Sequence, residues 1–264
     1  MTEEVLQDWP IRLFKRSVLK QRKFKEVTAM LGPTGGLTCL DIGGDNGVIS
    51  YLLRQRGGVW MSADLDTQSV QAIRELVKTD VYQLDGNCAQ FQTNTFHRVA
   101  IVDYLEHIPD DAAFLADLHR VMKPGGMVVI NVPHIKKGVL RSLRMALGQT
   151  DQKHGHLRPG YTIDSIKQTM DGFFICEEFS TYSKFFSELI DTLIVYSVSL
   201  LQKDKQGQSK KGLFVTGKDI KEYQNMFRVY SLIYPFVWLV SKLDRLLFFT
   251  SGYMLIVKAR VNKP

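Results

Sequence analysis

The sequence predicts an α/β fold with a mostly parallel sheet, and two observations carry this prediction. Short apolar runs typical of strands alternate with segments of helical periodicity along much of the chain. In addition, a strand expected at 36–42 runs into the glycine-rich turn Gly43-Gly44-Asp45-Asn46-Gly47, and a helix follows at 48–55. A turn of this kind is where parallel α/β folds bind ligands that carry a nucleoside.

The other elements of this fold follow in order. Apolar strands are expected at 59–63, 81–84, 98–102 and 127–132, and the helix before the last one has apolar residues at 114, 115, 118, 121 and 122. The first three of these strands run into Asp64, Asp85 and Asp103 respectively. Ligands of open α/β sheets bind outside the carboxyl ends of the strands, so these acids are candidate ligand contacts.

Length and composition fit one enzyme-sized domain with an elaboration. The chain has 264 residues, of which 45% are hydrophobic and 23% charged, which excludes disordered and repeat classes. Cys39, Cys88 and Cys176 have no metal-site spacing and are expected to be reduced thiols or small buried hydrophobes. The first residues are acidic and have no apolar run of signal-peptide length, which predicts a cytoplasmic protein.

The glycine-rich turn departs from the dinucleotide fingerprint G-x-G-x-x-G. Its glycines are Gly43, Gly44 and Gly47, and Asp41 precedes them. An acid in this place suits a cationic or zwitterionic ligand. The pattern resembles motif I of the class I S-adenosylmethionine-dependent methyltransferases, which usually reads acid-x-Gly-x-Gly-x-Gly. Asp45 stands here in place of the middle glycine.

Two further segments resemble the same family. Leu105-Glu106-His107-Ile108-Pro109-Asp110 is similar to its "LEHxxD" segment, and Lys123-Pro124-Gly125-Gly126 to its "KPGG" turn before the fifth strand. His97 departs from the aspartate that is usual there. The resemblance covers residues 36–182 and implies a Rossmann-like, seven-stranded methyltransferase sheet with helices on both faces. Within the family, the chain resembles the type 11 and ubiquinone-pathway small-molecule methyltransferases. The resemblance to the ubiquinone-pathway enzymes in the region after the fifth strand is loose.

The resemblance also implies S-adenosylmethionine as the cofactor. In this family the acid after the second strand, here Asp64, accepts hydrogen bonds from both ribose hydroxyls, and the acid after the third, here Asp85, bonds the adenine amino group. Phe91 or Cys88 would pack on the adenine. Asp64 and Asp85 have an alternative interpretation as ordinary strand-end acids. The full set of expected cofactor-binding residues is Asp41, Gly43, Gly44, Gly47, Asp64, Leu65, Asp85, Gly86 and Asp103.

Catalysis needs a base only if the methyl acceptor carries a proton, and histidine is the natural candidate. His107, His134, His154 and His156 fall near the expected catalytic edge of the sheet. Each has an alternative interpretation as a structural hydrogen-bonding residue. No metal site is expected, because no acids are spaced to join His154 and His156 as ligands.

The last two strands are expected at 173–182 and 253–261, and about 70 residues separate them, far more than a hairpin loop contains. This predicts a helical insertion between strands six and seven, with helices at 185–201 and 223–249 and a polar loop at 202–212. The expected domains are a basic helical cover (1–35), the methyltransferase core (36–182), the apolar insertion (183–252), and the last strand with the tail (253–264).

The insertion is strongly apolar, but its uncharged run is too short to span a membrane. This run, at 229–241, has about 13 residues, where roughly 20 are needed. It is either a helix pair packed on the sheet, a substrate lid, or a helix lying at a bilayer surface. The net charge is +7, and basic residues crowd 12–25. This segment either meets an anionic partner such as lipid head groups, or forms a solvated face.

These observations predict O-methylation of a hydrophobic or lipid-linked small molecule, by a protein that is cytoplasmic or peripheral at the inner face of the membrane. Nucleic acid is not expected as a substrate, because Asp103-Tyr104-Leu105-Glu106 lacks the Pro-Pro-aromatic motif that holds a flipped base. Two alternatives stay open: methylation of a sugar or polysaccharide, and a non-catalytic cofactor-binding scaffold. The sequence leaves the oligomeric state open.

Overall fold

The computed structural model describes residues 3–136, 138–151, 155–201 and 220–263. The chain forms two compact units. The sheet unit comprises 24–135, 157–181 and 254–264, and the helical unit comprises 1–23, 136–156 and 182–253. Each unit is described by itself.

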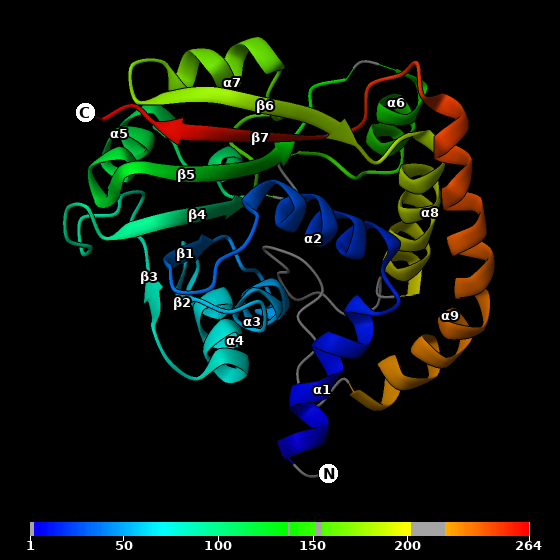
Figure 1. The fold of residues 1–264 in the computed structure, drawn as a ribbon. Coiled ribbons are helices and arrows are strands. Elements are labelled where there is room, and N and C mark those ends of the chain that lie inside the picture. Colours follow the sequence, from blue (N-terminus) through cyan, green and yellow to red (C-terminus); the bar gives the residue numbers. More distant parts are fainter. Residues whose placement is uncertain (1–2, 137, 152–154, 202–219, 264) are drawn as a thin grey trace. The chain divides into compact units, whose positions relative to one another are not determined.

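The sheet unit contains a seven-stranded sheet with the order β3-β2-β1-β4-β5-β7-β6 (Figure 1). Neighbouring strands from β3 to β5 are parallel, and β7 is antiparallel to β5. This confirms the expected fold class. The strands are β1 (Thr38–Ile42), β2 (Val59–Asp64), β3 (Val81–Gln83), β4 (Phe96–Val102), β5 (Met122–Pro133), β6 (Phe174–Tyr182) and β7 (Met254–Val261).

The helices that connect the parallel strands are α3 (Val48–Arg54), α4 (Thr67–Val77) and α5 (Asp111–Val121). Strand order runs outward from β1 in both directions, so right-handed crossovers place α3 and α4 on one face and α5 on the other. The sheet unit also contains α7 (Ile163–Met170) and the short 3₁₀ helix η1 (Leu105–His107), while α2 (Val18–Leu31) belongs to both units.

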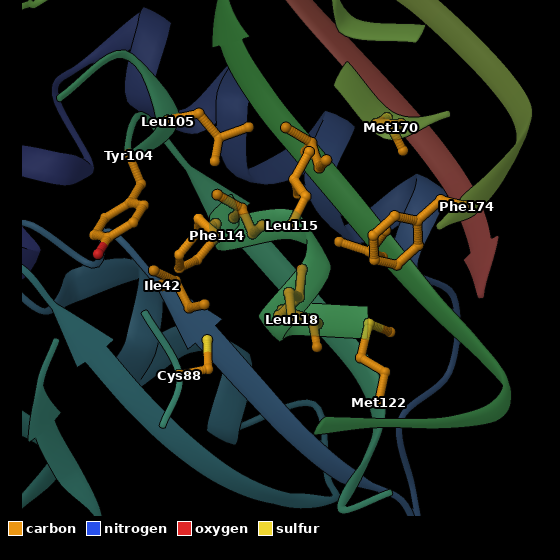
Figure 2. Packing of buried hydrophobic residues seen from close by; sticks show 14 of the residues in the cluster. Ile42, Cys88, Tyr104, Leu105, Phe114, Leu115, Leu118, Met122, Met170 and Phe174 are labelled. Atoms are coloured by element: carbon orange, nitrogen blue, oxygen red, sulfur yellow. The ribbon is translucent and has the colours of Figure 1, made fainter. Parts of the chain in front are cut away.

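The largest apolar cluster of this unit lies between the sheet and helix α5 (Figure 2). Phe114, Leu115, Leu118 and Val121 are all fully buried there, which confirms the apolar periodicity expected for this helix. Burial of one such side chain contributes roughly 1.5–3 kcal/mol to folding. The cluster therefore fixes α5 and, with it, the strand ends on which the candidate site is built.

The "KPGG" segment is a correction to the expected turn, because it lies inside β5. Phe96 pairs with Met122, and Arg98 pairs with Met127, so the register shifts across the segment. Gly125 has a φ of 69°, which an L side chain rarely adopts. The segment is a bulge that leaves and rejoins the ladder next to β4.

The helical unit contains α1 (Glu3–Phe14), α6 (Val139–Ala146), α8 (Phe185–Leu201), α9 (Ile220–Ser241) and the 3₁₀ helix η3 (Lys242–Leu247). The described residues between β6 and β7 are therefore mainly helical, as expected. The polar loop expected at 202–212 lies outside the described residues. The expected domain boundaries stay predictions, and the compact units divide α2 instead, after Lys23.

Helix α9 is held within its unit by aromatic side chains. The rings of Trp9 and Phe227 lie 5.0 Å apart. The Tyr230 hydroxyl donates to the carbonyl of Arg16 at 2.8 Å, and the Arg16 guanidinium lies over the Tyr234 ring. Among the described residues, no helix is long and apolar enough to cross a membrane.

Candidate cofactor and catalytic site

The candidate site lies at the carboxyl edge of the parallel strands. The loop at 43–47 follows β1, and Asp64 ends β2. Asp85 comes two residues after β3, and Asp103 directly follows β4. Because β1 to β4 are parallel neighbours, these residues share one edge of the sheet (Figure 1). The structure thus brings together the acids that the sequence singles out, all within the sheet unit.

Asp64 is fixed against the glycine-rich loop. Its carboxylate accepts hydrogen bonds from the backbone N–H of Asp45 at 3.2 Å and of Leu65 at 2.7 Å. Only 2% of Asp64 is exposed. The carboxylate is therefore a preorganised hydrogen-bond acceptor at the junction of two strand ends.

The carboxylate of Asp41 is engaged by contacts within the protein. Its carboxylate accepts from the Ser50 hydroxyl at 2.5 Å and the Ser62 hydroxyl at 2.8 Å, with the Arg54 guanidinium at 3.5 Å. Burial raises the pKa of Asp41, and these hydrogen bonds and Arg54 oppose the shift. The side chain ties β1 to α3 and β2, so its contacts favour action on a ligand through the loop it holds.

The glycines of the loop are required by the neighbouring protein. Gly43 has a φ of 85°, and a Cβ there would lie 2.0 Å from the carbonyl oxygen of Val102. Gly47 has a φ of 80°, and its Cβ would lie 2.8 Å from the Cα of Ile73. Asp45, at the middle position, adopts a φ of 50°, which Asp tolerates better than most residues. Asp45 is therefore compatible with the backbone conformation of the loop.

Tyr104 is a candidate site residue that the sequence analysis misses. It is fully buried, and its hydroxyl has no hydrogen-bond partner among the described residues. Burial raises its pKa, and the nearby Cys88, Asp64 and Asp85 raise it further. Figure 2 shows the hydroxyl directed away from Ile42 and Phe114. A buried tyrosine hydroxyl usually has a partner, so this one is available to a ligand beside the two acids.

The remaining expected cofactor contacts differ in exposure. Asp85 is exposed, Leu65 is half-buried, and a Cβ on Gly86 would meet nothing within 4 Å. Phe91 and Cys88 are core residues: Phe91 is 6% exposed, with edge-to-face contacts to two other rings, and Cys88 is fully buried. The edge of the sheet beyond β3 is open where Asp85 and Gly86 lie, whereas Phe91 and Cys88 are occupied by core packing.

Asp103 is positioned from β5. It has a φ of 48°, and its N–H donates to the carbonyl of Asn131 at 2.9 Å. The side-chain amide of Asn131 in turn donates to the Asp103 carboxylate at 2.9 Å. Asn131 is fully buried within an apolar strand. A polar residue in such a strand is unusual, and on this ground the sequence could have indicated Asn131 as a site residue.

The candidate bases fall into three groups. His107 lies in η1 and His134 directly after β5, both half-buried and both following parallel strands of the sheet unit. His156 belongs to the helical unit, where its N–H donates to the carbonyl of Asp151. His154 lies outside the described residues. Only His107 and His134 are therefore placed at the carboxyl edge of the described sheet.

Hydrogen bonds and an ion pair connect the segment that carries His107 to the loop before α7. The Arg158 guanidinium donates to the carbonyls of Ile108 and Pro109 and forms an ion pair with Asp111. The Tyr161 hydroxyl donates to the Asp111 carboxylate at 2.6 Å. These contacts fix the "LEHxxD" segment, and Arg158 and Tyr161 are positioning residues that the sequence analysis did not assign.

His97, the second departure from the family pattern, lies far from this edge along its strand. Its ring accepts from the backbone N–H of Thr38 at 3.1 Å and lies 3.1 Å from the Lys123 ammonium. Both partners are at the amino ends of β1 and β5, whereas the site is at their carboxyl ends. His97 therefore links strands and does not alter the candidate site.

Comparison with known proteins agrees with this geometry. Residues 40–130, about a third of the chain, match a family model described as a methyltransferase domain. A ubiquinone biosynthesis O-methyltransferase from Pseudomonas paraeruginosa is 32% identical over 102 residues, which cover 36% of this chain and 44% of that protein. A demethylmenaquinone methyltransferase from Tropheryma whipplei is 28% identical over 122 residues, covering 45% and 51%. The chain thus matches about half the length or less of these curated relatives.

Solved structures share the fold over most of the chain. A putative methyltransferase from Bacillus halodurans has a TM-score of 0.57 at 15% identity, covering 90% of this chain and 97% of that one. A cyclopropane synthase from Mycobacterium tuberculosis has a TM-score of 0.55 at 16% identity, covering 92% and 84%. At these identities the likeness concerns the fold alone.

The chain has the class I, Rossmann-like methyltransferase fold, and residues 40–130, which include the glycine-rich loop, match a methyltransferase domain. Within that class, the matched region is similar to quinone-pathway methyltransferases. The same findings support S-adenosylmethionine as the cofactor. The residues present fit it, because acids end β2 and follow β3 and the buried Tyr104 hydroxyl beside them lacks a hydrogen-bond partner among the described residues.

Proposed function

We propose that this chain is an S-adenosylmethionine-dependent methyltransferase that methylates an oxygen of a hydrophobic or lipid-linked small molecule. The observation that carries the proposal is the convergence of the loop at 43–47 with Asp64, Asp85 and Asp103 at one edge of a parallel sheet. This is the place where open α/β sheets bind nucleoside ligands.

In this proposal each acid has a distinct task. Asp64, held by the N–H groups of Asp45 and Leu65, accepts hydrogen bonds from the ribose hydroxyls. Asp85, exposed at the end of the neighbouring strand, accepts from the adenine amine. Tyr104 donates its hydroxyl to the nucleoside. The remaining expected contacts are Gly43, Gly44, Gly47, Leu65, Gly86 and Asp103, while Asp41 acts through the loop it holds.

When bound, the sulfonium of the cofactor supplies an electrophilic methyl group. The acceptor oxygen would take this methyl group from the sulfur, and the proton of the acceptor hydroxyl would pass to a base. His107 and His134 are the candidate bases placed at the sheet edge. His154 and His156 remain candidates by sequence position. The protein's own contribution is mainly alignment of the acceptor with the methyl group.

Two observations support a hydrophobic acceptor. The relatives are named for ubiquinone and menaquinone biosynthesis. The helices between β6 and β7 are rich in apolar and aromatic residues. An acceptor with a lipid tail would also place the protein at the inner surface of a membrane.

The test is to incubate the protein with methyl-labelled S-adenosylmethionine and a lysate from a strain that lacks it, then to partition the products. Label in the organic phase supports the proposal. Label confined to the aqueous phase would instead support a sugar or polysaccharide acceptor. Absence of labelled product, with the cofactor bound, would contradict enzymatic methyl transfer and favour a scaffold. Asp171→Asn changes an exposed acid beyond the end of α7. As a control, this variant should label the same product as the unchanged protein.

A further inference from the structure

Helix α9 has two apolar stripes, and among the described residues only one of them packs within the helical unit. The inner stripe consists of Phe227, Tyr230, Tyr234 and Val237. Phe227 stacks on Trp9, Tyr230 and Tyr234 form hydrogen bonds with the segment at 16–21, and Val237 is 7% exposed. Contacts within the unit therefore account for this side of the helix.

The other stripe has spacings of three and four residues that continue from α9 into η3. We call it the outer stripe; its members are Val229, Leu232, Phe236, Leu239, Leu243 and Leu246. Residues with this spacing share one side of a helix. Leu232 is 83% exposed, and Phe236 and Leu246 are each 66% exposed. The stripe is about 25 Å long at the helical rise per residue.

Such a surface is uncommon on a soluble protein, where exposed apolar residues are normally scattered singly. Phe248 and Phe249, directly after η3, are 84% and 73% exposed and extend the apolar surface further. Contiguous apolar surface of this kind marks a place where a partner or a membrane binds.

The charges beside the outer stripe identify the kind of partner. Arg228 and Arg245 are exposed, and Lys242 lies with its ammonium 4.4 Å from the centre of the Trp238 ring. The acid in this segment, Asp244, is occupied elsewhere, because its carboxylate accepts from the backbone N–H groups of Lys184 and Phe186 at the start of α8. The described charges available beside the stripe are therefore basic.

A second copy of the chain is a poor match for this surface. In a parallel pair of α9 helices each basic residue would face its own copy, and in an antiparallel pair Arg228 would approach the turn that carries Lys242 and Arg245. Like charges brought together across an interface oppose binding. An anionic lipid surface has the opposite charge and an apolar interior, and tryptophan favours the boundary between the two.

We propose that the outer stripe lies in the plane of an anionic bilayer surface, with its apolar side chains among the acyl chains and with Arg228, Lys242 and Arg245 at the phosphate groups. The surface holds the protein on the membrane without crossing it, in agreement with the length and polarity of the described helices. The inference does not depend on methyl transfer, since it concerns the helical unit and is measured without turnover.

Trp238 provides a direct probe. Of the three tryptophans, Trp9 and Trp60 are 6% and 3% exposed, whereas Trp238 is 47% exposed. Vesicles that contain phosphatidylglycerol should shift its emission to shorter wavelength, and lipids brominated on their acyl chains should quench it. Trp238→Phe should abolish both signals. Emission unchanged by vesicles and bromolipids would overturn the proposal, as would a blue shift that depends on protein concentration without vesicles.

Substitutions then test the residues. Phe236→Glu should lower partitioning onto these vesicles by at least about tenfold, because it puts a charge where the proposal places an aromatic ring among the acyl chains. The matched control is Ile175→Glu in the sheet unit, where the isoleucine is 54% exposed; its partitioning should stay as in the unchanged protein. Lys242→Gln and Arg245→Gln should each cost about fivefold.

Two outcomes of this series would contradict the proposal. One is equal sedimentation of Phe236→Glu and the unchanged protein with vesicles. The other is equal binding to phosphatidylcholine and to phosphatidylglycerol vesicles, which would remove the role of the basic residues. Titration of S-adenosylmethionine into Phe236→Glu keeps this test separate from the proposed function, because cofactor affinity should be unchanged.

Discussion

The two units differ in how much large apolar surface they leave open to solvent. The sheet unit buries its apolar strands and α5 in one large cluster. The helical unit buries Glu188 and Thr192, which are 5% and 2% exposed, while large apolar residues such as Leu232 are open to solvent. The comparison teaches that the sheet unit is organised around its own core, whereas the helical unit leaves large apolar side chains of α9 and η3 exposed.

Two kinds of buried polar group occur among the described residues. In the helical unit, Glu188 pairs with Arg144 at 3.4 Å and lies near Asp191. In the sheet unit, the Tyr104 hydroxyl lacks a hydrogen-bond partner among the described residues. Glu188 has its partner within the protein, whereas a buried hydroxyl without one is costly and is therefore a candidate contact for a ligand.

The largest expected effect concerns the close packing of the sheet unit. Gly43→Ala should lower the free energy of unfolding by more than about 3 kcal/mol, because its Cβ would overlap the carbonyl of Val102 at 2.0 Å. Urea unfolding followed by circular dichroism measures it. Gly86→Ala is the control: it has a similar positive φ of 68° and open space, and should cost only about 1–2 kcal/mol. Equal costs would show that the loop is not tightly packed.

Glu188 tests the interior of the helical unit. Burial, and then the neighbouring Asp191, raise its pKa from the ordinary 4.5 to about 8, against the opposing effect of Arg144 and Lys23. A raised pKa of this kind means that its contribution to stability is present below pH 4.5 and is lost as the pH rises to about 8.

Glu188→Gln should therefore raise the free energy of unfolding at pH 9 by on the order of 2 kcal/mol, since the uncharged side chain avoids burial of a carboxylate and loses only the Arg144 pair. Near pH 5 the two proteins should differ little. Melting temperatures across this pH range measure the effect, with Glu177→Gln, at a more exposed ion pair of the sheet unit, as the control. A variant less stable than the unchanged protein at pH 9 would mean that the ion pair outweighs burial.

The smallest expected effect sharpens the contrast between the two kinds of buried polarity. Tyr104→Phe should leave the stability of the protein equal or slightly higher, because it removes a hydroxyl that lacks a described partner. It should weaken S-adenosylmethionine binding by about fivefold, the value of one ordinary hydrogen bond. Calorimetric titration and thermal unfolding separate the two readouts. Lower stability with unchanged affinity would make Tyr104 a structural residue.

Local patterns predicted most of the sheet. Short segments encode the strand before Gly43, the apolar periodicity at 114–121, the acid that ends β2 and the acid that follows β3, and each was confirmed as an element or position. The helices between β6 and β7 were also expected, because about 70 residues exceed a hairpin loop. These features depend on residues that lie close together in the sequence.

The parts that the sequence could not predict depend on contacts between distant residues. The partners of Asp41 lie 9 to 21 positions away, so its engagement with Ser50 and Ser62 is visible only in three dimensions. The contact between His97 and Thr38 joins residues 59 positions apart. Tyr104 stands beside a recognised motif, but only its burial without a described partner distinguishes it.

The cofactor assignment of Asp64 is tested most directly by calorimetric titration of S-adenosylmethionine into the unchanged protein, Asp64→Asn and Asp171→Asn. The account predicts that Asp64→Asn weakens binding at least about tenfold, since hydrogen bonds to a charged acceptor contribute roughly 1.5–3 kcal/mol. Asp171→Asn should bind as the unchanged protein does, and thermal unfolding should show both variants folded. Undiminished affinity in a folded Asp64→Asn would contradict the assignment of this strand edge as the cofactor site.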